Sequence, residues 1–325
     1  MPITSVVTDP QALTMTVVAE FPVPVTRLWD AYADPRQLEK FWGPDGWPAT
    51  FSRHDFNAGG RSHYYMTGPD GEQFHGIWEY VAVEPHKSVT FYDKFAVEAG
   101  VENTEMPALH CVFAFEATDN GSRVTALTTF PSIEALEQLA EMGMEEGLRS
   151  GMAHMDDILA DLASYAAGLP TELQIIDDTH VRASRIIRGT PEQVWEAHHN
   201  PELMKRWLTG PDGWVMTDVK VGLAVGDKHA TAWEPEGGGE GGFGFEGEVL
   251  EFVPGVRAVT TEVMVGMEGP HTINELTFTP VDGGTLLTLV ITYPSKELRD
   301  MILATGMVDG MEASYARLEG QLASA

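Results

Sequence analysis

The sequence is poor in cysteine, with Cys111 as the one cysteine among 325 residues. A single thiol excludes an internal disulfide framework and a zinc site built from several cysteines, and it fits a reducing compartment. Positive charge is also scarce, because 20 Lys and Arg residues stand against 49 Asp and Glu residues and leave a formal net charge of −29. Such a surface repels phosphate backbones and anionic lipid head groups, so we expect no nucleic-acid or membrane partner.

Long apolar runs are missing as well. No stretch of about 18 apolar residues occurs, and the opening residues MPITSVVTDPQALT lack the basic segment and apolar core of a signal peptide. These absences predict a cytoplasmic protein. The chain is nonetheless rich in core-forming residues, with 43% hydrophobic residues and 8 Trp, which excludes a disordered chain.

Motifs for catalysis are few. No His-x-x-x-His pair and no Gly-x-Ser-x-Gly turn is present, and His198 and His199 are adjacent, so they diverge on a helix. His110 and Cys111 are neighbours on an expected strand and point to opposite faces, which argues against a nucleophile and its base. The sequence therefore predicts no metal, no cofactor and no catalytic triad.

The second half of the sequence repeats the first. The segments 42–47 and 207–214 both begin with tryptophan and contain an unbroken GPDGW. Other landmarks keep the same order: Trp29 matches Trp195, Asp34-Pro35 matches Asn200-Pro201, Gly60 matches Gly226, Gly76 matches Gly247, Pro131-Ser132 matches Pro294-Ser295, and Gly143-Met144 matches Gly306-Met307. A shared period of this kind indicates two copies of one fold. We expect domains over residues 11–168 and 174–325, with the join near a Gly-Pro pair.

Each copy has the pattern of an α+β fold. Thr190-Pro191-Glu192-Gln193 contains the N-cap, proline and capping-box glutamine of a helix start, and Asp34-Pro35 repeats the N-cap and proline in the first copy. Alternating segments separated by turn residues predict an antiparallel meander. After Pro131-Ser132, the residues from Met144 to Leu162 place an apolar stripe at helical spacing and predict one long amphipathic helix. The expected order is a strand, two short helices, about six strands and a long helix.

These elements resemble the START-like, helix-grip (SRPBCC) superfamily and, more narrowly, the homologues of the activator of the heat-shock-protein-90 ATPase. The resemblance rests on FWGPDGW after a tryptophan-bearing helix, AGGR at a strand entry, the strand HGIWEYVAVEP, and GMEEGL in the closing helix. It covers nearly all of the chain, once per copy. It implies two tandem helix-grip domains, in each of which a curved antiparallel sheet grips a long C-terminal helix and leaves a cavity for apolar ligands.

Small residues on the long helix bear on such a cavity. Gly147 and Gly151 lie on its core stripe, and Gly310 and Ser314 repeat them in the second copy. A glycine inside a helix costs about 1 kcal/mol relative to alanine. Either the helix approaches the sheet closely at these residues, or they form part of a cavity wall, and the sequence leaves both interpretations open.

Aromatic and methionine side chains are the candidates for lining a cavity that holds a flat or lipidic molecule. With the small helix residues included, the candidate ligand-binding set is Trp42, Trp47, Tyr64, Met66, Trp78, Tyr80, Phe91, Phe113, Met144, Gly147, Leu148, Gly151, Trp207, Trp214, Phe245, Phe278, Met307 and Met311. Where the first copy has Tyr64, Trp78 and Tyr80, we expect Ala230, Val249 and Glu251 in the second. The two cavities should therefore differ in shape and polarity.

Three functions follow from these features. The scaffold and the lack of a catalytic motif favour non-catalytic binding of apolar or aromatic small molecules between sheet and helix. One alternative is a cyclase- or hydrolase-like enzyme with His63, His110 or Glu79 as acid or base, and His63 aligns with His229 in the second copy. The other alternative, implied by the family resemblance, is a protein partner: a co-chaperone-like regulator of a heat-shock-protein ATPase.

Overall fold

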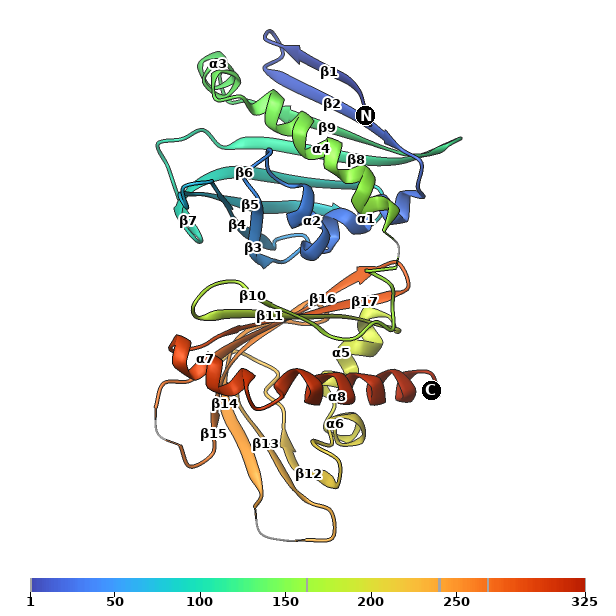
Figure 1. Cartoon of the computed structure of the whole chain (residues 1–325), viewed down its shortest axis with the longest axis vertical. Coiled ribbons are helices and arrows are strands. Elements are labelled where there is room, and N and C mark those ends of the chain that lie inside the picture. The colour runs from blue at the N-terminus through green and yellow to red at the C-terminus, as the bar shows by residue number, and fades with distance from the viewer. Residues whose placement is uncertain (1, 162, 239–240, 268, 325) are drawn as a thin grey trace. The chain divides into compact units, whose positions relative to one another are not determined.

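The computed structural model describes residues 2–161, 163–238, 241–267 and 269–324. The chain divides into two units, residues 1–163 and 164–325. Both units combine an antiparallel sheet with helices in the same order along the chain (Figure 1). The expected α+β class and the repeat of one architecture are therefore confirmed.

The first unit begins with a hairpin and ends with a helix that lies across the sheet (Figure 1). Its elements are β1 (Ile3–Asp9), β2 (Thr14–Phe21), α1 (Val25–Ala33), α2 (Pro35–Phe41), β3 (Ala49–His54), β4 (Arg61–Thr67), β5 (Gln73–Glu84), β6 (Ser88–Glu98), β7 (Val101–Glu102), β8 (Leu109–Thr118), β9 (Gly121–Thr129), α3 (Ile133–Glu141) and α4 (Met144–Ala160). The strand order is β1-β2-β9-β8-β6-β5-β4-β3, and β7 pairs with β6. Helices α1 and α2 thus carry the chain from β2 to β3 at the far edge of the sheet.

The second unit repeats this plan, and its described residues contain no counterpart of β7. Its elements are β10 (Glu172–Ile175), β11 (His180–Ile187), α5 (Pro191–His199), α6 (Pro201–Trp207), β12 (Trp214–Lys220), β13 (Lys228–Pro235), β14 (Phe243–Val253), β15 (Arg257–Met264), β16 (Thr272–Val281), β17 (Gly284–Thr292), α7 (Lys296–Leu303) and α8 (Met307–Leu322). The strand order is β10-β11-β17-β16-β15-β14-β13-β12. None of the described helices in either unit has the length and apolar character needed to cross a membrane.

The helix starts follow the capping pattern read from the sequence. Asp34 accepts a hydrogen bond from the backbone N–H of Arg36 at 3.0 Å, and Thr190 and Gln193 form the capping box of α5. These side chains satisfy backbone donors that have no partner inside the helix. The predicted starts of α2 and α5 are confirmed.

The predicted long helix is confirmed as α4, but the structure places a shorter helix, α3, before it that was not expected from the sequence. Ser132 caps the short α3, and α4 begins only after Gly143, whose φ of 83° is left-handed. Gly306 has a φ of 82° at the same place between α7 and α8. Glycine adopts this conformation without the penalty that a Cβ atom brings, and the reversal in φ interrupts the right-handed helix.

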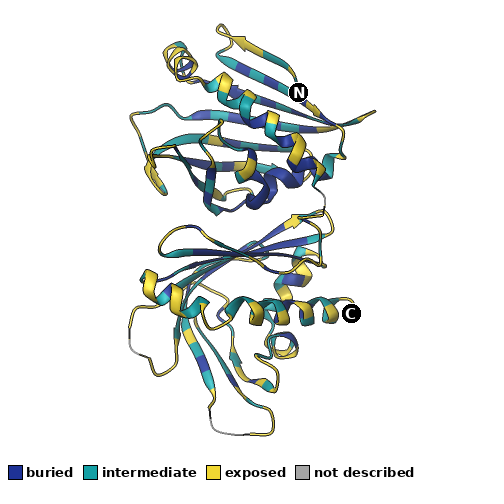
Figure 2. Cartoon of the chain, in the orientation of Figure 1, coloured by how far each residue is buried: buried dark blue, intermediate teal, exposed yellow. Residues whose placement is uncertain are grey.

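One face of the first sheet packs against α1 and α4, and we call it the inward face. Trp29 of α1 lies 5.1 Å from Phe115 of β8 between ring centroids, and the Tyr32 hydroxyl donates to Met155 Sδ of α4 at 3.7 Å. Buried residues alternate with more exposed ones along the strands (Figure 2). Because successive strand residues point to opposite faces, the neighbours of inward residues lie on the outward face.

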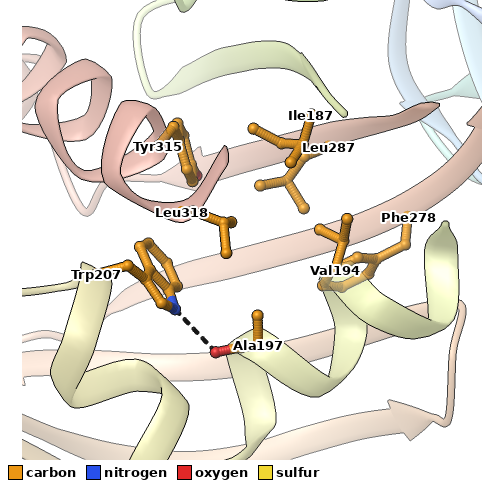
Figure 3. Close-up of a cluster of buried hydrophobic side chains, with 8 residues drawn as sticks. All are labelled: Ile187, Val194, Ala197, Trp207, Phe278, Leu287, Tyr315 and Leu318. Carbon is orange, nitrogen blue, oxygen red and sulfur yellow. Dashed lines mark hydrogen bonds between the residues drawn. The ribbon is translucent and has the colours of Figure 1, made fainter. Parts of the chain in front are cut away.

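The core of the second unit contains the buried cluster drawn in Figure 3: Ile187, Val194, Ala197, Trp207, Phe278, Leu287, Tyr315 and Leu318. Trp207 Nε1 donates to the Ala197 carbonyl at 2.9 Å. Trp207 is the last residue of α6 as Phe41 is of α2, so Phe41 is its counterpart and Leu208 takes the place of Trp42. The match of Trp42 with Trp207 is therefore wrong by one residue, because Thr209 is an extra residue before the shared GPDGW.

Candidate functional site

The inward face of the first sheet carries a connected group of aromatic rings. The ring centroid of Trp78 on β5 lies 4.6 Å from that of Trp42, 5.7 Å from that of Tyr64 and 4.8 Å from that of Phe91. Phe91 in turn contacts Tyr80 at 6.1 Å and Phe113 at 5.2 Å. The structure thus brings together the candidate residues Trp42, Tyr64, Trp78, Tyr80, Phe91 and Phe113.

Gly76 allows the Tyr64 ring to lie across the neighbouring strand. The two residues are paired in register, and a Cβ atom on Gly76 would lie 2.3 Å from the ring carbon Cζ of Tyr64. With the ring in this position, the Tyr64 hydroxyl donates to Asp93 Oδ1 at 3.3 Å. The glycine therefore determines where the phenol meets the carboxyl group.

Asp93 of β6 is an acidic residue in an otherwise apolar inward series. It pairs with Trp78 in the ladder, and Phe91 and Phe95 precede and follow it on the same face. Burial raises the pKa of the Asp93 carboxyl to about 7, and interactions with the Tyr64 hydroxyl and the Trp78 indole offset only part of this. No Lys, Arg or His of the described chain forms an ion pair with it. A carboxyl group held this way destabilises the fold, and such groups cluster at functional sites.

Two indole donors beside Asp93 complete no well-formed hydrogen bond among the described residues. Trp78 is 1% exposed, and neither its Nε1 nor the buried Nε1 of Trp42 has a partner in hydrogen-bonding geometry. The Trp42 indole approaches the Tyr64 hydroxyl, and the Trp78 indole approaches Asp93. Buried donors normally have hydrogen-bond partners. These indole N–H groups and the Asp93 carboxyl group therefore form a polar region among the aromatic rings. We call Trp42, Tyr64, Trp78 and Asp93 the acid–aromatic site.

Helix α4 touches the backbone of α2 at one point and leaves space one turn earlier. A Cβ atom on Gly151 would lie 2.7 Å from the Phe41 carbonyl oxygen, whereas no atom lies within 4 Å of a Cβ atom on Gly147. Nearby, the Asp45 N–H donates to Ser150 Oγ at 3.2 Å. Gly151 therefore marks a close approach to α2 and not a cavity wall, while the position beside Gly147 is open. Met144 and Leu148 are partly buried on the same helix.

We expect Gly151→Leu to lower the free energy of unfolding of the first unit by about 1–3 kcal/mol, because the new side chain overpacks a backbone contact. The matched variant Gly147→Leu should leave it unchanged or raise it by up to about 1 kcal/mol through better helix propensity. Denaturant unfolding of both variants checks this. Equal effects of the two substitutions would contradict the contact assigned to Gly151.

The three candidate catalytic residues lie on the outward face, which corrects the expectation of a cavity acid or base among them. Glu79 follows the inward Trp78, and its Oε2 lies 2.8 Å from Lys94 Nζ. His63 follows the inward Ser62, and the His110 ring lies 5.2 Å from the exposed Tyr92 ring. The strand alternation separates all three from the acid–aromatic site.

The second unit places a carboxyl group at the position of Asp93. Glu262 of β15 lies as many residues after Pro254 as Asp93 lies after Pro85. The β5–β6 hairpin has a register shift after Tyr80, and the β14–β15 hairpin has one after Val249. Burial raises the pKa of Glu262, and a hydrogen bond with the Asn274 side chain offsets part of this.

The rings of the acid–aromatic site have no counterparts in the second unit. The register places Thr231, Gly247 and Val249 where the first unit has Tyr64, Trp78 and Tyr80, so the expected set Ala230, Val249 and Glu251 is wrong. For the same reason Gly247 does not match Gly76, and His229 corresponds to Ser62 and not to His63.

The remaining candidates are spread over several places. In the first unit, Trp47 contacts Phe74 at 5.2 Å near the β4–β5 turn, and Met66 pairs with Ala49 at the same end of the sheet. In the second unit, Trp214 and Phe245 both contact the Phe243 ring. Phe278 belongs to the cluster of Figure 3, and Met311 packs against that cluster. Met307 Sδ accepts a hydrogen bond from the Tyr293 hydroxyl at 3.8 Å.

Asp93 and Glu262 are the functional candidates that the sequence reasoning missed. The signal was present, because each is an acid at an inward position of an alternating strand and both copies have one at the same place. A different kind of site is not indicated: the described residues contain no group of three or more His, Cys, Asp or Glu side chains placed to hold a metal ion.

Comparison with known proteins finds one family twice along the chain. The family model described as Activator of Hsp90 ATPase homolog 1-like protein matches residues 22–160 and residues 188–323. A crystal structure of a protein from Mycobacterium smegmatis is 48% identical over 49% of this chain and 97% of its own, with a TM-score of 0.46. A solution structure from Arthrobacter aurescens is 43% identical over 49% and 93%, with a TM-score of 0.47. A crystal structure from Rhodobacter sphaeroides is 29% identical over 48% and 100%, with a TM-score of 0.45. The comparison with curated proteins found no match.

Proposed function

The chain belongs to the Activator of Hsp90 ATPase homolog 1-like family, of which it holds two tandem copies, and on this premise we propose that it binds apolar or aromatic small molecules without transforming them. The acid–aromatic site of the first unit is the proposed binding place. The observation that carries the proposal is the Asp93 carboxyl group, which lies among rings and forms no ion pair with any described residue. A few polar groups in an apolar surrounding are typical of small-molecule sites.

The open position beside Gly147 supports the same place. Helix α4 contacts the end of α2 at Gly151, and one turn earlier it leaves room for added atoms. The two glycines lie on one side of the helix, since residues four apart are neighbours on a helix surface. A ligand over the rings would occupy the side of the sheet that α4 covers.

Binding without chemistry is favoured by what surrounds the rings. Burial raises the pKa of the Cys111 thiol, which keeps it protonated and unreactive. The candidate bases His63 and His110 lie on the outward face. An enzyme is the second candidate, and the observation in its favour is again Asp93, because a carboxyl pKa of about 7 suits proton transfer near neutral pH.

Titration with the neutral fluorescent probe N-phenyl-1-naphthylamine tests the proposal. We expect saturable binding, and we expect Gly147→Phe to weaken it by about tenfold or more, a change of at least about 1.4 kcal/mol, because the ring fills the open position. The matched control is Gly310→Phe in the second unit, where a Cβ atom also meets nothing within 4 Å. Absence of saturable binding, or equal losses in the two variants, would contradict the proposed site.

A further inference from the structure

We propose that the acid–aromatic site takes an organic cation: an apolar or aromatic molecule whose protonated amine pairs with Asp93 and lies against the rings of Trp42, Tyr64 and Trp78. This inference rests on the proposed binding function and adds the chemical class of the ligand. Among the described residues, no Lys, Arg or His supplies this positive charge to Asp93.

Asp93 lacks a partner of opposite charge. It receives a hydrogen bond at 3.3 Å from the Tyr64 hydroxyl, the Trp78 indole also approaches it, and no cation of the described chain forms an ion pair with it. An ionised carboxylate in an apolar place is costly unless it is paired and hydrogen-bonded. A protonated amine supplies the opposite charge together with strong donors, and such charge-assisted hydrogen bonds are about twice as strong as neutral ones.

The rings around the carboxyl group stand at steep angles to one another. Trp42 is perpendicular to both Trp78 and Tyr64, with an interplanar angle of 89° in each pair, and Tyr64 and Trp78 meet at 61°. In a perpendicular pair the edge of one ring meets the face of the other, and Trp42 is the half-buried member of the three. A cation within about 6 Å of a ring centroid is attracted to that face, most strongly for tryptophan.

The charge of Asp93 and of the whole chain disfavours anionic and neutral ligands. An anionic ligand would bring a second negative charge to Asp93, and it would have to approach a chain with a net charge of −29. The same net charge raises the local concentration of cations and speeds their encounter with the protein. A neutral alcohol can donate to Asp93 but leaves the carboxylate charge uncompensated.

The second unit gives an internal contrast. Glu262 is a carboxyl group at the same place, but Leu208, Thr231 and Gly247 stand where the first unit has Trp42, Tyr64 and Trp78. Glu262 also has a hydrogen-bond partner in Asn274. The three rings around Asp93 are therefore specific to the first unit, whereas the second unit has Trp233, Phe243 and Phe245 in contact with one another. Because Glu262 already has a partner in Asn274, we expect one amine site per chain.

Calorimetry with three matched probes at pH 8 tests the inference: 1-naphthylmethylamine, 1-naphthylmethanol and 1-naphthoate. The amine should bind most tightly, with one site per chain, and the carboxylate most weakly. Asp93→Asn should weaken the amine by about ten- to hundredfold while the alcohol changes by less than about threefold. The controls are Asp119→Asn, which removes an exposed acid with the same change of charge, and Glu262→Gln at the equivalent place. Both should leave the amine affinity unchanged.

The outcomes separate this inference from the proposed function. If amine and alcohol bind equally, or if Asp93→Asn weakens both alike, the cation assignment is overturned while the binding function stands. If Glu262→Gln loses amine binding while Asp93→Asn keeps it, the assignment of the amine site to the first unit is overturned. If the unmodified chain binds none of the three probes, the proposed function fails and this inference fails with it.

Discussion

Asp93→Asn is expected to raise the free energy of unfolding of the first unit by up to about 4 kcal/mol at pH 8. The pKa of this carboxyl group is about 7 in the fold and 3.8 in an exposed aspartate, and a pKa difference of one corresponds to about 1.4 kcal/mol. The folded state holds the proton more tightly than the unfolded state does. The stability contributed by the protonated Asp93 carboxyl group is therefore fully present below pH 4 and is lost as the pH rises through 7.

Hydrogen exchange of β5 and β6 amides at pH 5 and pH 8 provides the measurement, because it reports on the unfolding of this unit by itself. The stabilisation by Asp93→Asn should be about 2 kcal/mol at pH 5 and about 4 kcal/mol at pH 8. Asp119→Asn serves as the control with equal charge change at an exposed position. A stabilisation that does not vary with pH would show that the carboxyl group is not buried as described.

Acidification is expected to destabilise the second unit through His198, by about 2 kcal/mol between pH 7 and pH 5. Burial lowers the pKa of this imidazole from 6.5 to about 4, and its Nδ1–H donates to the Val194 carbonyl at 2.7 Å. The second nitrogen is buried without a described partner beside the rings of Trp207 and Phe278. Charging it places a cation in the cluster of Figure 3.

The lowered pKa of His198 determines the direction in which stability changes with pH. The unfolded state takes up the proton first as the pH falls below 6.5, so stability declines until the folded imidazole titrates near pH 4. His198→Asn keeps a donor near the Val194 carbonyl but has no charge to gain, and it should flatten the dependence between pH 7 and pH 5. The exposed His271→Asn is the control. A slope that persists in His198→Asn would assign the acid sensitivity to another group.

The sequence predicted the fold well because its signals are local and repeated. The capping residues Asp34 and Thr190 start their helices as expected, and the GPDGW repeat identified two copies of one architecture. Helix α3 was missed although Ser132 caps it, and the left-handed Gly143 separates it from the predicted long helix α4.

The site was harder to predict because it depends on register and on contacts distant in sequence. Alternation alone could not decide whether His63 or Tyr64 points to the inward face of the sheet. Irregular pairing, such as the register shift after Tyr80, changes which residues lie opposite one another on neighbouring strands. The inward place of Asp93 is a consequence of the same register. The contact of Gly151 is with the α2 backbone, which no pattern within the closing helix reveals.

Two units with the same strand order on one chain create a hazard of misassembly while the chain folds, because an element of one copy can dock in the place of its counterpart. The contact between α4 and α2 opposes one such exchange. Helix α8 carries Ser314 where α4 carries Gly151, and a side chain at that place would meet the Phe41 carbonyl oxygen at 2.7 Å. A serine at that place would overpack the contact with α2, so this difference between the copies disfavours α8 in the place of α4.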